Sequence, residues 1–403
     1  MGLSQIPERQ RGGLPGGQPD GQRDSQRWDI FCAVVDNYGD IGVCWRLARQ
    51  LTQEHGLAVR LWVDHLPSFR RICPTLDAGL DAQVQSGVEI RRWTAPFPDV
   101  VPAAVVIEAF ACNLPERYIA AMAALAQVEQ RPVWINLEYL SAEPWVVGCH
   151  ALASPHPRLP LIKYFFFPGF VPGTGGVLRE SALGEERRAF QGNAAAQEEF
   201  WRGLGLPTRE SRGPQESRLS LFCYPNPAAA RLFAELAASP APSLCLVPEG
   251  VASEAIAGFF NGASAYQRGN LEVRVLPFVE QAQYDRLLWA SDCNFVRGED
   301  SFVRAQWAAR PLVWHIYPQD EEAHQRKLLA FLDLYCAGLA PEAAADVRKF
   351  WLAWNHQLAV EPGWTGFWRH RAALQAHADW WAGELSKTTG LAENLVRFCA
   401  GKL

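Results

Sequence analysis

The sequence predicts an α/β protein of two domains, each a doubly wound, mostly parallel sheet covered by helices. The chain has 403 residues, more than one hydrophobic core usually spans. Short continuous apolar runs alternate with helix-compatible segments, as in buried parallel strands. This alternation occurs twice, and a charged stretch separates the two series. We therefore expect two domains that face each other across a cleft.

The first domain is expected over residues 28–180. Residues 1–27 are predicted to be a disordered extension, because they hold few apolar side chains to offset the entropy of ordering. The first strand is predicted at Ile30–Val35 and the first helix from Ile41 to about Gln53. Further strands are expected at Val59–Val63, Val88–Ile90, Val105–Ile107 and Val133–Leu137.

A second series of strands follows residues 181–218, which are predicted to form a linker with a helical segment because they are rich in Gln, Glu and Arg. The second domain is expected over residues 219–385. Its predicted strands are Leu219–Tyr224, Leu244–Val247, Val273–Leu276, Cys293–Val296 and Leu312–Trp314. Residues 386–403 are predicted to contain an amphipathic terminal helix.

The amino-acid composition limits which partners and cofactors are expected. Hydrophobic residues make up 49% of the chain, enough for two cores, and the formal charge of −5 argues against nucleic acid as a partner. No apolar run is long enough to span a membrane and no secretory signal is present, so we expect a cytoplasmic protein without a membrane partner. Because the ten cysteines lack Cys-x-x-Cys spacing and no Asp-x-Asp pair occurs, neither a metal ion nor a resident cofactor is expected.

Two carboxylates frame the loop between the first predicted strand and helix, residues 36–42 (DNYGDIG). Ligands bind beyond the carboxyl ends of strands in doubly wound sheets, so this loop should face the cleft. Gly39 and Gly42 would allow close approach of the backbone. The alternative is that Asp40 caps the helix and Asp36 supports the turn.

A second candidate site is residues 294–302 (NFVRGEDSF), where a predicted strand gives way to a helix. The amino end of a helix attracts phosphate, and Arg297 would add a permanently charged contact to a diphosphate. Glu299 could accept hydrogen bonds from a sugar hydroxyl. The alternative is that Ser301 is an ordinary N-cap and that Arg297 and Glu299 form a surface ion pair.

A third candidate follows the strand that ends at Leu276. Phe278 is suited to stacking on a base, and Gln281 is suited to hydrogen-bonding it. The alternative is that Phe278 belongs to the hydrophobic core.

Residues 36–51 (DNYGDIGVCWRLARQL) and 295–302 (FVRGEDSF) resemble the elongation factor P arginine rhamnosyltransferase family (EarP), and the order of elements is similar from about Trp28 to Leu403. The resemblance implies a GT-B fold of two Rossmann-like domains, with the donor held mainly by the second and the terminal helix packed back on the first. It also implies an inverting, metal-independent transfer of L-rhamnose from dTDP-β-L-rhamnose to an arginine of elongation factor P, which activates that factor for rescue of stalled ribosomes.

Carried over by position, Asp36 and Asp40 match the essential aspartates of the family. We expect Asp40 to act as the base and Asp36 to orient the acceptor or the sugar, although the two could exchange roles. The residues expected to bind substrate are Tyr38, Gly39, Tyr224, Phe278, Gln281, Arg297, Glu299, Asp300 and Ser301.

Two other functions stay open. One is a GT-B enzyme acting on a small-molecule or lipid-linked acceptor, because the cleft alone does not name the acceptor. The other is a non-catalytic Rossmann-like partner of a translation factor.

Overall fold

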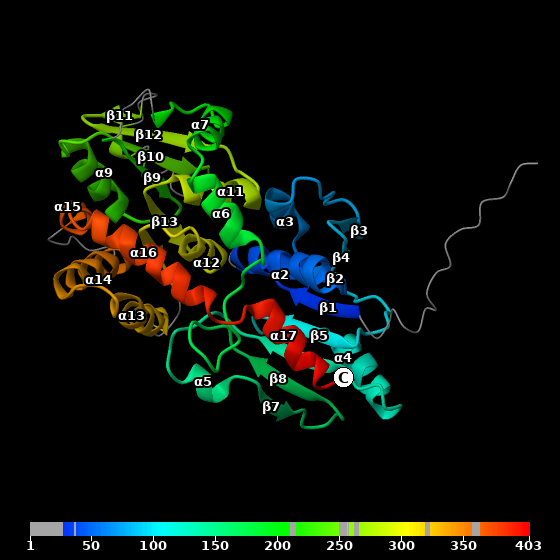
Figure 1. Cartoon of the computed structure of the whole chain (residues 1–403). Coiled ribbons are helices and arrows are strands. Elements are labelled where there is room, and N and C mark those ends of the chain that lie inside the picture. Colours follow the sequence, from blue (N-terminus) through cyan, green and yellow to red (C-terminus); the bar gives the residue numbers. More distant parts are fainter. Residues whose placement is uncertain are drawn as a thin grey trace, which may run out of the picture.

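The computed structural model of the chain describes residues 27–35, 38–209, 215–249, 256, 258–261, 266–318, 323–356 and 363–403. Most of the predicted extension and the predicted catalytic residue Asp36 lie outside these ranges. The described residues form two α/β domains, each built on one sheet (Figure 1). The predicted fold class is therefore confirmed.

The first sheet has the strand order β3-β4-β2-β1-β5-β6-β8-β7. The edge strands β3 and β7 run antiparallel to their neighbours, and the strands between them pair in parallel. Its elements are β1 (Arg27–Cys32), α2 (Gly39–His55), β2 (Ala58–Val63), α3 (Leu66–Ile72), β3 (Ala82–Gln85), β4 (Val88–Arg92), β5 (Val105–Ala109), α4 (Glu116–Gln127), β6 (Val133–Leu137), α5 (Val146–Cys149), β7 (Leu152–Pro155) and β8 (Ile162–Phe166).

Both faces of this sheet are covered, which explains the continuous apolar runs of its central strands. In β1, Ile30 and Cys32 join the core cluster that contains α2. Between them, Phe31 points to the opposite face and packs with Tyr118 and Met122 of α4. Successive strand residues therefore enter different cores, and polar side chains are excluded at most of these positions.

The second sheet has the order β11-β12-β10-β9-β13-β14, with β11 antiparallel at one edge. Helices α6 (Leu183–Gln191) and α7 (Ala194–Gly203) precede it. The remaining elements are β9 (Ser217–Leu221), α9 (Ala228–Ala238), β10 (Ser243–Pro248), β11 (Gln267–Arg268), β12 (Leu271–Leu276), α11 (Gln281–Ala290), β13 (Cys293–Arg297), α12 (Asp300–Trp307), β14 (Leu312–His315), α13 (Ala323–Cys336), α14 (Pro341–His356), α15 (Trp364–Trp368) and α16 (Arg371–Ser386).

The chain then returns to the first domain through α17 (Leu391–Ala400), which lies beside the first sheet in Figure 1. This helix contacts α2. Leu391, Leu395 and Cys399 occupy one face of α17 and are buried in the core cluster that contains α2. The first domain is thus completed by a segment that follows the whole second domain in the sequence. Within the described ranges, no helix is long and apolar enough to cross a lipid bilayer.

The first strand ends at Cys32, three residues before the predicted end at Val35. The backbone N–H of Val34 donates to Asp64 Oδ1 at 2.9 Å, and that of Val35 donates to Asp40 Oδ2 at 2.9 Å. Because these donors bind carboxylates, they do not continue the ladder of the sheet. The chain therefore leaves the sheet where the first candidate loop begins.

Candidate active site

A cavity lies where the two domains meet, at the carboxyl ends of both sheets. This is the position at which doubly wound domains bind their ligands. It is lined by Tyr38, Gly39 and Ile72 of the first domain and by Phe222, Pro248, Phe278, Val279, Gln281, Tyr284, Arg297, Asp300 and Ser301 of the second. Residues from both sequence motifs therefore share one cavity.

Asp40 lies in the first turn of α2, behind the lining residue Gly39. Its carboxylate accepts hydrogen bonds from the backbone N–H of Val35 at 2.9 Å and from the Tyr139 hydroxyl at 3.1 Å. The N-cap position belongs to Tyr38, and no side chain caps the helix there. The alternative in which Asp40 serves as a helix cap is therefore wrong.

Tyr139 is a contact of Asp40 that sequence analysis missed. It follows the carboxyl end of β6, and its ring stacks on Phe110, which follows the neighbouring strand β5, with 4.4 Å between ring centroids and an interplanar angle of 15°. The Lys327 ammonium lies 5.5 Å from the centroid of the Tyr139 ring. These contacts fix the ring and aim its hydroxyl at the carboxylate.

Arg297 is the last residue of β13 and is only 6% exposed. Its guanidinium lies 4.3 Å from the ring centroid of Phe222 and 4.8 Å from that of Tyr224, and Nη1 donates to the Cys223 carbonyl at 3.4 Å. The alternative of a surface ion pair is therefore wrong. Aromatic faces hold a permanent cation beside the cavity, which suits an anionic ligand.

The loop after Arg297 is held by Ser301. The Ser301 hydroxyl donates to the Arg297 carbonyl and accepts from the Arg297 backbone N–H. Because α12 begins at Asp300 with Glu299 as its N-cap residue, Ser301 lies inside the helix and is not an ordinary N-cap. Gly298 has a φ of 58°, a conformation that favours glycine and turns the chain from strand to helix. The amino end of α12 therefore meets the cavity next to Arg297.

Glu299 lies behind the cavity wall, and its Oε2 accepts from the backbone N–H of Leu140 in the first domain at 3.0 Å. Burial raises the pKa of Glu299 from 4.5 to about 8, and the nearby Asp40 contributes in the same direction. At neutral pH its carboxyl group is therefore mainly protonated and can donate a hydrogen bond as well as accept one.

The raised pKa of Glu299 predicts how stability depends on pH. The folded chain holds this proton between about pH 4.5 and about pH 8, whereas the unfolded chain releases it. The free energy of unfolding should therefore fall as the pH rises through this window, and Glu299→Gln, which cannot ionise, should lack this contribution. Denaturant midpoints of both proteins at about pH 5, 6.5 and 8 measure the difference. Parallel pH curves would contradict it.

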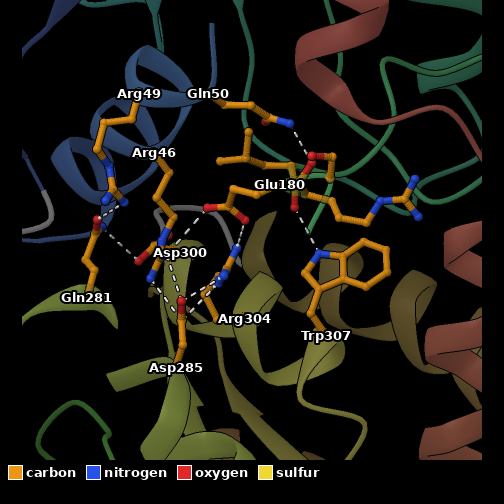
Figure 2. Close-up of polar contacts among 12 residues, drawn as sticks. Arg46, Arg49, Gln50, Glu180, Gln281, Asp285, Asp300, Arg304 and Trp307 are labelled. Atoms are coloured by element: carbon orange, nitrogen blue, oxygen red, sulfur yellow. Dashed lines mark hydrogen bonds and ion pairs between the residues drawn. The ribbon is translucent and has the colours of Figure 1, made fainter. Parts of the chain in front are cut away.

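Asp300 and Gln281 line the cavity but also contact the first domain (Figure 2). Asp300 Oδ1 accepts from Arg46 Nε at 2.8 Å. Gln281 donates to the Gly42 carbonyl at 3.1 Å and accepts from Arg49 Nη2 at 3.1 Å. Gly42 therefore allows the backbone of α2 to approach the second domain closely, whereas the sequence predicted a close approach to a ligand.

Phe278 forms part of the aromatic wall. Its ring centroid is 5.0 Å from that of Tyr38, and the Arg71 guanidinium carbon lies 5.1 Å from it. Phe278 is half-buried and packs against the core cluster of the first domain, as the alternative proposed, but it also lines the cavity together with Tyr38. The two rings come from different domains and touch each other in a tilted arrangement, so they form one continuous aromatic wall.

Tyr224, Asp40 and Glu299 are not among the lining residues of this cavity. The ring of Tyr224 packs against Arg297, which in turn lines the cavity. Phe222 and Tyr284 line the cavity and were not singled out from the sequence, because neither has a local motif that distinguishes it from a core aromatic residue. Within the described part of the chain, no group of three or more His, Cys, Asp or Glu side chains is placed to hold a metal ion.

Two domains with mostly parallel sheets meet at this cavity, which is lined by a buried arginine beside the start of a helix, and glycosyltransferases with two Rossmann-like domains share this arrangement. The family model described as "Elongation-Factor P (EF-P) rhamnosyltransferase EarP" matches residues 28–400. The chain belongs to this family and is, by that membership, an arginine rhamnosyltransferase.

Individual relatives agree. The chain is 52% identical over 379 residues to the protein-arginine rhamnosyltransferase of Pseudomonas aeruginosa, which covers 93% of this chain and 98% of that protein. The enzyme of the same name from Neisseria meningitidis serogroup B is 35% identical over 391 residues, covering 92% and 96%. A solved structure described as "Structural basis for EarP-mediated arginine glycosylation of translation elongation factor EF-P" matches with a TM-score of 0.66 at 36% identity, covering 94% of this chain and 99% of that chain. The GT-B architecture is thereby confirmed.

Proposed function

We propose that this chain transfers L-rhamnose from dTDP-β-L-rhamnose to an arginine side chain of elongation factor P, with inversion, without a metal ion and in the cytoplasm. One observation carries the proposal. A single cavity brings the loop before α2 of the first domain together with Phe278, Arg297 and the amino end of α12 of the second. The names of the relatives support the sugar and the acceptor.

The donor is proposed to bind mainly to the second domain. Its thymine would stack on Phe278, and its diphosphate would lie between Arg297 and the amino end of α12. The helix end supplies unpaired N–H groups, and the guanidinium supplies a permanent charge. As the bond to the sugar breaks, these groups would stabilise the negative charge that develops on the leaving dTDP.

The acceptor guanidinium is a poor nucleophile because it is protonated at pH 7. Removing its proton beforehand would cost about 8 kcal/mol for a pKa of about 13. We propose that Asp40 holds and polarises the guanidinium, so that proton loss accompanies or follows attack on the anomeric carbon. Asp36 is proposed to orient the acceptor or the sugar.

A single displacement would invert the anomeric carbon. The guanidinium nitrogen forms its bond to carbon on the face opposite dTDP, the bond from carbon to the phosphate oxygen breaks, and the released proton passes to Asp40. No protein nucleophile is needed for such a step. Enclosure of the reactants between the two lobes would exclude water, which otherwise competes as acceptor.

Intact-mass analysis of elongation factor P after incubation with the enzyme and dTDP-rhamnose tests the proposal. The expected result is the gain of one deoxyhexose, which fragmentation locates on arginine. If the factor binds without gaining mass, the chain is a silent partner of a translation factor. If it neither binds nor gains mass while the enzyme consumes donor on another acceptor, the acceptor assignment is wrong.

The hydrogen bond from Tyr139 to Asp40 gives a further prediction. Tyr139→Phe keeps the stacked ring but removes the hydroxyl that fixes the carboxylate. Turnover should fall about 10-fold, within the range that one positioned hydrogen bond contributes, and dTDP affinity should be unchanged. Steady-state kinetics and calorimetry measure the two effects. Wild-type turnover would show that the Tyr139 hydroxyl is not needed to position Asp40.

A further inference from the structure

Helix α2 is bound to the second domain by Arg46, which is 2% exposed and lies six residues after Asp40. Its Nη1 and Nη2 donate to both carboxylate oxygens of Asp285 in α11 at 3.0 Å, and its Nε donates to Asp300 Oδ1 at 2.8 Å. In Figure 2 this side chain extends from α2 to the carboxylates below it. One guanidinium therefore joins the helix that begins at the proposed base to the loop proposed to hold the donor.

A second arginine completes this interdomain cluster. Arg304 of α12 donates to both oxygens of Asp285 at 3.0 and 2.7 Å and to Glu180 Oε2 at 2.5 Å. Glu180 also lies 3.7 Å from Arg46. Burial favours the neutral form of Glu180, but Arg304 and Arg46 outweigh it and lower its pKa to about 2. Glu180 thus stays ionised at every physiological pH.

Gly42 brings the two domains into direct contact. A Cβ added at Gly42 would lie 3.2 Å from Cβ, Cγ and Oδ2 of Asp300. Carbon atoms pack best about 3.5–4.0 Å apart, so a methyl group there would push on Asp300. The Gly42 carbonyl accepts from Gln281, whose amide oxygen accepts from Arg49. Positions 42, 46 and 49 share one face of α2 because they are four and three residues apart.

Asp40 is held from a different direction. Its carboxylate is bound by Val35 and Tyr139 at the strand ends of the first domain. The same helix therefore carries the proposed base in its first turn and contacts Gln281 and Asp300 of the second domain through its next turns. A packed helix is rigid over this length, so the two contacts are mechanically coupled.

We propose that α2 fixes the position of one domain relative to the other. In this role Gly42 and Arg46 are positioning residues, which set the distance between Asp40 and the donor loop. The inference rests on the proposed function, in which Asp40 and that loop bring the reactants together. Buried ion pairs add little net stability relative to apolar residues but penalise every arrangement in which a charge loses its partner. Here that penalty favours one position of the two domains relative to each other. This position matters because a displacement of about 1 Å between two reacting groups can lower the rate about 100-fold.

Gly42→Ala tests this positioning role of α2. Alanine favours the helix, and its added methyl group tightens only the contact with Asp300. The matched control is Gly383→Ala in α16, where an added Cβ meets nothing within 4 Å. We expect kcat of Gly42→Ala to fall at least about 10-fold, with dTDP affinity within about 3-fold of wild type, and wild-type kinetics for the control. Wild-type kcat in Gly42→Ala, or an equal loss of dTDP affinity and kcat, would overturn the inference.

Arg46→Lys is the second variant, which decides the question if Gly42→Ala does not fold. Lysine keeps the charge but not the fork that binds Asp285 and Asp300 together. The same split is expected, with kcat reduced about 10-fold or more and dTDP affinity kept. Unchanged kcat would overturn the positioning role of α2. If wild-type enzyme itself fails to modify elongation factor P, the proposed function falls instead, so the two failures are distinct.

Discussion

Asp40→Asn is expected to lower kcat for transfer by about 10²–10⁴-fold, the range that a positioned general base contributes. The amide is close in shape to the carboxylate and can still accept from the Val35 N–H or the Tyr139 hydroxyl. It cannot take the guanidinium proton or balance its charge. Because the proposed donor contacts lie mainly on the other domain, dTDP binding measured by calorimetry should stay within about 2-fold of wild type.

Asp99→Asn is the matched control, because Asp99 belongs to the same domain and its side chain is 79% exposed beside Arg117. Its turnover should equal that of the wild type. Near-normal turnover of Asp40→Asn would remove Asp40 as the base and direct attention to Asp36. Loss of both turnover and dTDP binding would instead indicate damage to the fold, which thermal unfolding would reveal.

Arg297→Ala is expected to weaken dTDP binding by about 10- to 100-fold, since a hydrogen bond to a charged group contributes about 1.5–3 kcal/mol. The loss should fall mainly on the diphosphate, so the affinity for thymidine alone should change little. The rings of Phe222 and Tyr224 also lose the cation that they flank. Calorimetry with dTDP and with thymidine separates the two contributions.

Arg274→Ala is the control for this substitution, because Arg274 lies in the same domain with its side chain 53% exposed beside Glu272. It should bind dTDP as the wild type does. An unchanged dissociation constant for Arg297→Ala would count against Arg297 as the diphosphate contact. Equal losses for dTDP and thymidine would show that the arginine supports the aromatic wall rather than the charge.

Buried parallel strands could be predicted from sequence because both of their faces are apolar. The predicted segments around Leu61, Ile107, Ile135, Leu246 and Val296 all lie in strands. The edge strands β3, β7 and β11 were not predicted. They are two to four residues long and mostly exposed, so their sequences carry neither an apolar run nor a clear alternation. Their pairing is decided by the neighbouring strand.

The cavity could be anticipated only in part. The positions after buried strands pointed to Gly39, Phe278, Gln281 and Arg297, the family resemblance added Tyr38, Asp300 and Ser301, and all of these line it. The contacts behind the wall could not be found in this way. Arg46 and Asp300 are 254 positions apart, and Tyr139 and Asp40 are 99 apart. Such pairs leave no local pattern, because only the folded arrangement of the lobes brings them together. The roles of the named residues stay predictions.

The return of α17 to the first domain constrains how this chain is made. Leu391, Ala392, Leu395 and Cys399 fill a core whose other buried members, from Trp28 to Leu178, are synthesised before the second domain. While the ribosome produces the middle of the chain, the apolar side of α2 that α17 will cover has no permanent partner. The amino-terminal lobe therefore matures last although it emerges first, and any fusion placed after α17 must leave that helix free to dock.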